Sequence, residues 1–321
     1  MKFPMKKRFF ALIVILVFGL FLTGCNSSSD APSPPATEDA LSPLRIATLP
    51  ALESIPIFIA QNHGFFEDEG LVVYIEHFFN PRDRDIAFLA DETIDGMVFD
   101  LVQLVIYQEG GLDLVATTGT IGLAGVISQP HITSIADLAG QNVLSTTNTS
   151  MDYVLDRALA SGGLSMADVI IDEVPALPTR LEMLLHDQAA AAMLPDPFAA
   201  LGIEEGKNLL ITTRDLGINP FVLAFRREVT QYNLESLQAF YRAINRAIEF
   251  LNNSDREEFI DLLIETVGYP PHVRDTLVVP HFPAYQLPTA AIVEDVLAFA
   301  QDRGLLTIEL SVADIIFDIA P

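Results

Sequence analysis

Short apolar segments alternate with amphipathic helical segments through the first part of the chain, and the alternation restarts after Gly119. The helical segments repeat their apolar residues every three or four positions, and the segments between them are short enough to be strands. Such alternation predicts α/β sheets covered by helices, and two runs of it predict two such units. The expected strands are 44–49, 71–78, 96–99 and 112–117 in the first run, then 143–145, 169–174 and 189–194 in the second.

The last third of the chain follows a different pattern. Residues 221–225 look like a strand that returns to the first unit. From Asn233 onward apolar side chains keep helical spacing over five turns, and further helices are expected at 256–266 and 290–301. The part of the chain that begins at Leu44 is longer than one hydrophobic core usually supports, and half of all residues are hydrophobic. The sequence therefore predicts two domains.

The N-terminus has the features of a secretory signal. Four cations precede an apolar run from Phe9 to Leu22, which is shorter than the roughly 20 residues of a membrane-spanning helix. The run ends in Leu22-Thr23-Gly24-Cys25, which resembles the lipobox of bacterial lipoproteins, whose cysteine is acylated and becomes the first mature residue. We therefore expect residues 1–24 to be a lipoprotein signal peptide and Cys25 to carry lipid. An uncleaved signal anchor with a chance cysteine is the alternative.

Residues 25–43 are rich in Ser, Pro, Asp and Ala and have almost nothing to bury, which predicts a flexible tether. The globular part is then expected outside the cytoplasm, held at the cell membrane through the lipid on Cys25.

Charge and motifs exclude several classes of function. The formal net charge is −25 at pH 7, and a surface of this charge repels nucleic acid and anionic lipid. The chain has no Gly-x-Ser-x-Gly, His-Glu-x-x-His or Gly-x-x-x-x-Gly-Lys motif. Its six histidines lack metal-ligand spacing, and Cys25 is its one cysteine. We expect no nucleic-acid partner, no catalytic residue, no metal and no cofactor.

A series of short motifs resembles solute-binding proteins for nitrate, sulfonates and thiamine precursors. The opening is Leu44-Arg45-Ile46-Ala47, followed from residue 57 by the run IFIAQNHGFFEDEGL. Later matches are Asp95-Gly96, the run IADLAG that begins at residue 135, and the run LPDPF that begins at residue 194. They occur in the family's order across most of the chain that follows the predicted signal.

The resemblance implies an α/β fold of the type II periplasmic-binding kind, with two α/β lobes joined by two crossover strands and a ligand cleft between them. In that family the lobes close on a small-molecule ligand, and the closed form docks on the permease and ATPase subunits of an ABC importer. The matching order places lobe I at residues 44–119 plus 224–321 and lobe II at 120–223. We expect a monomer, because lobes that close need free surfaces.

Ligands of open α/β sheets bind at the carboxyl ends of strands, where helix N-termini point free N–H groups outward. Three loops and one further carboxylate occupy such positions here. The candidate ligand-binding residues are Leu52, Glu53, Ser54, Asp100, Thr146, Thr147, Asn148, Thr149, Ser150 and Asp196. Alternatively, Ser54, Asp100 and Ser150 are simple helix caps, and Glu53 is a solvated loop charge. The five small polar residues from Thr146 exceed what one cap requires.

The candidate loops contain carboxylates and no basic residue, and only Arg82 and Arg84 lie near them in the sequence. Carboxylates close to an anion in a closed cleft oppose its binding. We therefore expect a neutral or amine-bearing ligand, such as a thiamine-related pyrimidine or another nitrogen heterocycle. A sulfonate or nitrate ligand is the alternative. A sensory lipoprotein, which reports its ligand to a receptor instead of a permease, also stays open.

Overall fold

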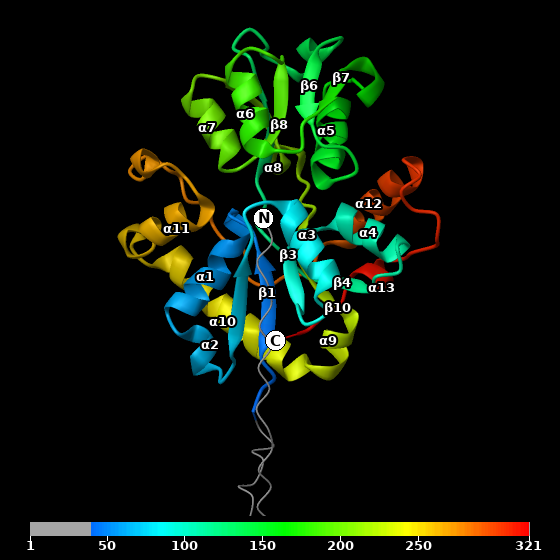
Figure 1. Ribbon diagram of the computed structural model, residues 1–321. Coiled ribbons are helices and arrows are strands. Elements are labelled where there is room, and N and C mark those ends of the chain that lie inside the picture. Colours follow the sequence, from blue (N-terminus) through cyan, green and yellow to red (C-terminus); the bar gives the residue numbers. More distant parts are fainter. Residues whose placement is uncertain (1–39, 321) are drawn as a thin grey trace, which may run out of the picture. The chain divides into compact units, whose positions relative to one another are not determined.

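The computed structural model of the protein describes residues 40–320. These residues form ten strands and a series of helices (Figure 1). The strands are Leu44–Thr48 (β1), Val73–His77 (β2), Gly96–Asp100 (β3), Leu114–Gly119 (β4), Ala124–Ser128 (β5), Asn142–Ser145 (β6), Ile170–Glu173 (β7), Ala191–Pro195 (β8), Asn208–Thr212 (β9) and Phe221–Arg226 (β10). The predicted signal peptide, Cys25 and most of the predicted tether lie outside the described residues.

The α-helices vary from single turns to the long helix α10. They are Ile55–Asn62 (α1), Phe65–Asp68 (α2), Pro81–Ala90 (α3), Leu101–Glu109 (α4), Ser150–Ser161 (α5), Leu177–Leu185 (α6), Phe198–Glu204 (α7), Thr213–Leu216 (α8), Arg227–Tyr232 (α9), Leu234–Asn253 (α10), Ile260–Val267 (α11), Ala290–Asp302 (α12) and Val312–Ile315 (α13). Within residues 40–320, none of the helices combines the length and the apolar character that a membrane crossing requires.

The strands form two separate five-stranded sheets, and each sheet mixes parallel and antiparallel pairs. The order is β2-β1-β3-β10-β4 in one sheet and β7-β6-β8-β5-β9 in the other. We call the first sheet with its helices lobe I and the second lobe II. The chain crosses between them twice, through residues 120–123 and 217–220. The predicted α/β class is thereby confirmed.

The second crossover leads into β10, the strand that the sequence predicted at 221–225. β10 begins at Phe221 and pairs antiparallel with β3 and β4 in the sheet of lobe I. The strands β5 and β9 were not predicted. Every residue of β5 is buried, so it lacks the alternation that marks a half-exposed strand, and its Gly125 weakens the strand signal further.

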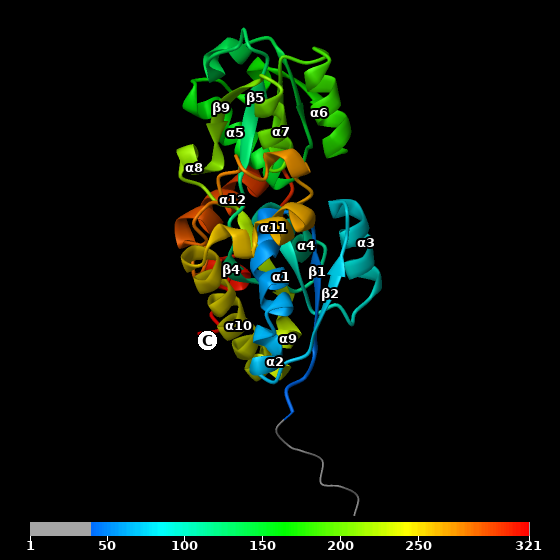
Figure 2. The same cartoon turned by 90° about the vertical axis from the view of Figure 1, so that its left-hand side faces the viewer.

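The central strands of each sheet are buried on both faces. Along β10, Val222 and Ala224 pack with α4 and α12, whereas Leu223 and Phe225 pack with α1 and α10 on the opposite face. Figure 2 looks onto the side of lobe I that carries α1, α10 and α11. In lobe II, α5 covers one face of the sheet, and α6 and α7 cover the other. Strands covered on both faces read as apolar runs, which is the pattern seen in the sequence.

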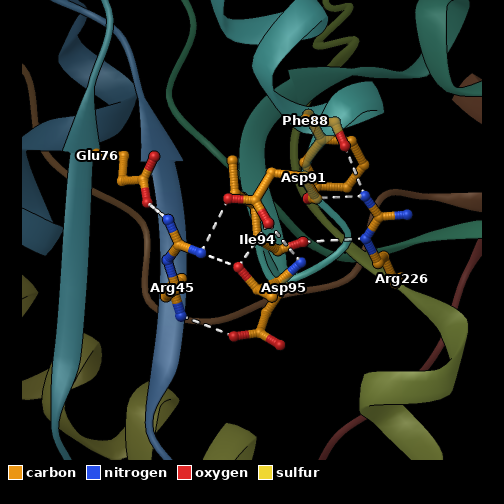
Figure 3. A network of polar contacts seen from close by, with 8 residues as sticks. Arg45, Glu76, Phe88, Asp91, Ile94, Asp95 and Arg226 are labelled. Carbon is orange, nitrogen blue, oxygen red and sulfur yellow. Dashed lines mark hydrogen bonds and ion pairs between the residues drawn. The ribbon is translucent and has the colours of Figure 1, made fainter. Parts of the chain in front are cut away.

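At the end of the lobe I sheet where β1 begins, Arg45 joins two neighbouring elements (Figure 3). Its backbone amide donates to Asp95 Oδ2 at 2.7 Å. Its guanidinium pairs with Glu76 on β2 and with Asp91 Oδ2, the latter at 3.0 Å. Because these side chains are partly exposed, the ion pairs fix geometry more than they add stability.

Arg226, the last residue of β10, completes this network from the other side (Figure 3). Its guanidinium is buried and lies 4.2 Å from the centre of the Phe88 ring. It donates to the carbonyl oxygens of Phe88 at 2.6 Å and Ile94 at 3.0 Å, which are the end of α3 and the loop before β3. Buried carbonyl groups with no strand partner are thereby satisfied.

Gly96 is a position where no side chain fits. It starts β3 between β1 and β10, and a Cβ there would lie 2.5 Å from the Phe225 ring and 2.8 Å from the carbonyl oxygen of Ala224. We predict that Gly96→Ala lowers the free energy of unfolding by about 1–3 kcal/mol, measured by urea denaturation, because the overpacked core must shift. Gly119→Ala is the control, since its nearest neighbours would lie at 3.7 Å. Equal stability of both variants would contradict the prediction.

Candidate functional site

The carboxyl ends of β1 and β3 in lobe I face the loops that follow β6 and β8 in lobe II. Gln103 on α4 donates from Nε2 to the carbonyl oxygen of Asn148 at 3.4 Å. The Asp100 carboxyl, whose pKa is raised by burial, lies beside the Ser150 hydroxyl, which opposes that shift. The structure therefore brings predicted residues of the two lobes into one region.

Glu53 lies in a 3₁₀ turn between β1 and α1. Burial raises the pKa of its carboxyl from 4.5 to about 7, while a backbone N–H hydrogen bond opposes that shift. The charge of Asp196 raises this pKa further, and the charge of Arg84 lowers it. Glu53 is thus a part-buried acid that is partly protonated near neutral pH, which favours a site residue over the solvated loop charge of the alternative.

Asp196 follows β8 of lobe II and is the acid whose charge acts on Glu53. Its Oδ1 accepts from the backbone amide of Ala200 at 3.2 Å. Burial raises the pKa of Asp196, and the hydrogen bonds from Ala200 and from the Tyr269 hydroxyl lower it. Tyr269 belongs to lobe I, so this contact joins the lobes, and the pKa of its hydroxyl is raised by burial and by Asp196.

Asp100 serves two purposes. It caps α4, because its Oδ1 accepts from the backbone amide of Gln103 at 2.9 Å, as the capping alternative predicted. Burial also raises its pKa, and Arg84 opposes that shift. Arg84 is itself buried and paired with Asp85 at 2.6 Å, so Asp85 offsets part of its charge.

The loop from Thr146 to Ser150 is held mainly by its own lobe. The Thr149 hydroxyl donates to the Thr146 carbonyl at 3.0 Å, and the Thr147 hydroxyl donates to Glu173 at 2.9 Å. The Asn148 amide donates to Asp152 at 3.1 Å, and Asn148 takes a positive φ of 58°. Thr149 occupies the N-cap position without a side-chain bond, and the first residue of the helix is Ser150. The alternative in which Ser150 caps the helix therefore does not match the structure.

Two serine hydroxyls at this loop are buried without a well-formed hydrogen bond to any described residue. They belong to Ser145 at the end of β6 and Ser150 at the start of α5. The hydroxyl of Thr120 in the first crossover is likewise buried without a hydrogen bond to any described residue. Leaving a buried polar group unpaired costs about 1–3 kcal/mol, so such groups point to a ligand or to water.

Sequence reasoning missed Arg180 on α6. Its side chain is fully buried, donates to the carbonyl oxygens of Met193 and Val174 at 2.5 and 2.9 Å, and also donates to the Thr146 hydroxyl. Among residues 40–320 it forms no ion pair with a carboxylate, and burial lowers its pKa to about 10. The available signal was its position in the apolar stripe of the helix with Leu181 and Leu184.

The side chains of two other predicted ligand residues, Leu52 and Ser54, make their contacts within lobe I. The Leu52 side chain packs in the apolar core and is 3% exposed. The Ser54 hydroxyl is buried and donates to the Leu49 carbonyl at 2.7 Å, and it makes no capping bond to α1. Their side chains are therefore left out of the ligand contacts proposed below.

Two hollows adjoin the crossovers. A cavity of about 40 Å³ lies in lobe I beside Glu53, Tyr241 and Phe282, and it has room for water rather than for an organic ligand. A more open groove of about 510 Å³ lies along both crossovers, beside Arg214 and His281. None of the predicted ligand residues lines the groove. In the described part of the chain, no three His, Cys, Asp or Glu side chains are grouped so as to hold a metal ion.

Comparison with known proteins gives a family match across the site. The family described as "NMT1/THI5 like" matches residues 51–258. The riboflavin-binding protein RibY of Chloroflexus aurantiacus is 24% identical over 288 residues, which cover 82% of this chain and 79% of that protein.

Solved structures with the same fold come from binding proteins and from an enzyme. The periplasmic aliphatic sulphonate-binding protein SsuA of Escherichia coli has a TM-score of 0.75 at 20% identity, covering 85% of this chain and 97% of that one. The desulfurization enzyme DSZB has a TM-score of 0.65 at 13% identity, covering 86% and 96%. At these identities the similarity establishes the type II periplasmic-binding fold alone, which confirms the predicted architecture.

The buried carboxyl of Glu53 makes stability depend on pH. Its pKa is higher in the folded chain than in the unfolded chain, so its proton stabilises the fold fully below about pH 4.5 and less as pH rises through about 7. We predict that urea denaturation of Glu53→Gln shows a smaller loss of stability between pH 5 and 8, by up to about 3 kcal/mol. Glu265→Gln, at an exposed position of α11, is the control. Parallel pH profiles for Glu53→Gln and the parent would exclude the buried acid.

Proposed function

The chain belongs to the NMT1/THI5-like family, and from this premise we propose that it is an extracytoplasmic, lipid-anchored solute-binding protein. It captures a small organic ligand between its two lobes and delivers that ligand to the permease and ATPase of an ABC importer. The ligand is an uncharged or amine-bearing nitrogen heterocycle.

Capture by closing of the lobes is supported by the contacts across the cleft. Asp100 and Gln103 of lobe I meet Ser150 and Asn148 of lobe II, and Tyr269 meets Asp196. Two crossovers connect the lobes, so one lobe can rotate on the other without unfolding either sheet. A ligand that contacts both lobes stabilises the closed arrangement by its differential affinity.

The observation that carries the choice of ligand is the pair of part-buried acids Glu53 and Asp196, which come from opposite lobes and lie near enough for the charge of Asp196 to raise the pKa of Glu53. A third acid, Asp100, is also part-buried with a raised pKa. Protonated, such a group donates a hydrogen bond to a ring nitrogen or carbonyl; ionised, it accepts one from an N–H or an ammonium group. Riboflavin, the ligand named for the Chloroflexus relative, is an uncharged nitrogen heterocycle of this kind. A thiamine-related pyrimidine has the same functional groups.

A sulfonate or nitrate ligand is the second candidate, and Arg180 favours it. This buried guanidinium has no carboxylate partner in the described residues and contacts Thr146 of the ligand loop. Its N–H groups are, however, mostly taken by carbonyl oxygens, so it orders the loop more than it offers donors to an anion.

The composition of the cleft supports binding rather than catalysis, because hydrogen bonds to a bound heterocycle would account for its acids. A receptor in place of the permease would use the same closing cleft, so sensing remains a variant of the proposal.

We predict that riboflavin or a thiamine-related pyrimidine raises the melting temperature of the full chain by roughly 5–10 °C at about 100 times its dissociation constant. Calorimetry supplies the signal, because the chain has no tryptophan. Polyamines, alkanesulfonates and nitrate complete the panel. A shift with a sulfonate or nitrate alone would keep the binding role and refute the proposed ligand class.

The acids should decide the affinity for a ligand found in that panel. Glu53→Gln and Asp196→Asn are each expected to weaken binding roughly 10- to 100-fold in calorimetric titration, because each removes a hydrogen bond to a charged or polarised group. Glu265→Gln should bind like the parent. Unchanged affinity in both site variants would refute the charge argument.

Lipid attachment gives a separate prediction. Cells producing the protein should incorporate labelled palmitate into it, and the protein should sediment with membranes. Cys25→Ser should lose both properties, whereas Ser29→Ala should keep them. A Cys25→Ser protein that stays lipid-labelled would exclude this anchor.

A further inference from the structure

The helices α5 of lobe II and α12 of lobe I meet beside the crossovers through a dense set of charged and aromatic side chains. α5 packs on the lobe II sheet, and α12 packs on α4 and α13 of lobe I. We call the residues of this contact the α5–α12 cluster: Asp152, Tyr153, Asp156 and Arg157 on α5, with Asp295, Phe299 and Arg303 on or directly after α12.

Asp295 is the centre of the cluster. Arg157 donates to it twice, from Nε to Oδ2 and from an Nη to Oδ1, both at 2.9 Å. The Tyr153 hydroxyl donates to the same Oδ2 at 2.6 Å. Although burial acts to raise the pKa of Asp295, the bonds from Arg157 and Tyr153 outweigh it and lower that pKa. Three hydrogen bonds from lobe II thus reach one carboxylate of lobe I. They fix the relative orientation of these side chains more closely than a single surface ion pair would.

A second ion pair crosses the same boundary in the opposite sense. Arg303 of lobe I lies 3.3 Å from Asp156 and 3.7 Å from the buried Asp152 of lobe II. Each lobe therefore presents an arginine to carboxylates of the other lobe. Because charge alternates across the contact, sliding or separating the helices breaks both pairs.

Aromatic rings pack against the charged side chains of the cluster. The rings of Tyr153 and Phe299 meet edge to face with centres 5.4 Å apart, and Tyr153 is fully buried. The guanidinium groups of Arg157 and Arg303 lie 5.8 and 5.0 Å from the centre of the Phe299 ring. Because the Arg157 and Asp295 side chains stay 29% and 42% exposed, the rings shield these ion pairs only partly from water.

We propose that the α5–α12 cluster holds the two lobes in the closed arrangement, with Asp295 as the positioning residue that sets the closed fraction and hence the ligand affinity. Asp295 touches no ligand in this proposal. It acts through α5, whose first turn contains Ser150 and follows the Thr146–Thr149 loop at the cleft. The link to affinity rests on the function proposed above, since apparent affinity falls in proportion to the fraction of binding-competent protein.

The sheet order offers a direct measurement of closure without any ligand. β2 and β7 lie at the edges of their sheets farthest from the strands that carry the crossovers. Tyr74 on β2 and Ile170 on β7 are exposed, so Tyr74→Cys and Ile170→Cys in the full chain with Cys25→Ser accept one spin label each. Pulsed electron resonance then gives the distribution of distances between the lobes.

Asp295→Asn should increase the ratio of long to short distances roughly tenfold, the change expected for losing a hydrogen bond between charged groups. Arg157→Gln should do the same, and the double variant should add little, because both remove one interaction. Tyr153→Phe should have a smaller effect in the same direction. Asp261→Asn, which breaks the Arg274–Asp261 pair within lobe I, is the matched control. Identical distributions for the parent and Asp295→Asn in folded protein would overturn the proposal.

A titration with riboflavin separates this proposal from the proposed function. If riboflavin binds, its dissociation constant should rise in Asp295→Asn by the factor by which the closed fraction falls. An unchanged constant despite a changed distance distribution would overturn the link from the cluster to affinity. If riboflavin does not bind the parent, and Asp295→Asn still changes the distribution, the ligand assignment fails while the role of the cluster in closure stands.

Discussion

The insertion of β10 between β3 and β4 is the constraint on which the arrangement of this protein depends. β10 follows the whole of lobe II in the sequence. It nevertheless supplies the fourth strand of the lobe I sheet and is buried along its length. Without its backbone hydrogen bonds, β4 would separate from β3, and α4 and α12 would lose the surface on which they pack. Because β10 follows lobe II in the chain, the same insertion requires two crossovers, and these crossovers connect the lobes. In the proposed function, the lobes would separate along these crossovers while each core stays intact.

The proposed ligand cleft contains acids and a buried arginine. Lobe I contributes Glu53 and Asp100, and lobe II contributes Asp196, all part-buried and all with raised pKa values. Arg180 is a buried cation of lobe II, and it is satisfied by carbonyl oxygens instead of a carboxylate. In the proposed function the acids would change protonation with the ligand, whereas the arginine would keep its charge and its bonds. A site of this composition would suit neutral or basic groups better than a fixed anion.

Site residues at the ends of strands could be predicted from the sequence. Residues whose place depends on burial in the folded chain could not. Glu53, Asp100 and Asp196 each follow an apolar strand, so their approach to one another is a consequence of the α/β topology. Arg180 was hidden because a polar residue in a buried helix stripe looks like an interruption. Leu52 was taken for a cleft residue, although its 3₁₀ turn directs the side chain into the core. The contact of α5 with α12 joins segments separated by more than a hundred residues, which no local pattern records.

The network around Arg45 has a mechanical consequence. β1 begins at Leu44 beside that network and runs toward the cleft, with β2 and β3 parallel to it on either side. Tension transmitted through the residues before Ala40 would pull β1 along its own axis, so the hydrogen bonds to both neighbours would share the load simultaneously instead of yielding in succession. Arg45 spreads that load at its entry point to Glu76 and Asp91. If the proposed lipid anchor is present, it would pull on the protein while the proposed cleft, at the opposite end of β1, stayed undistorted.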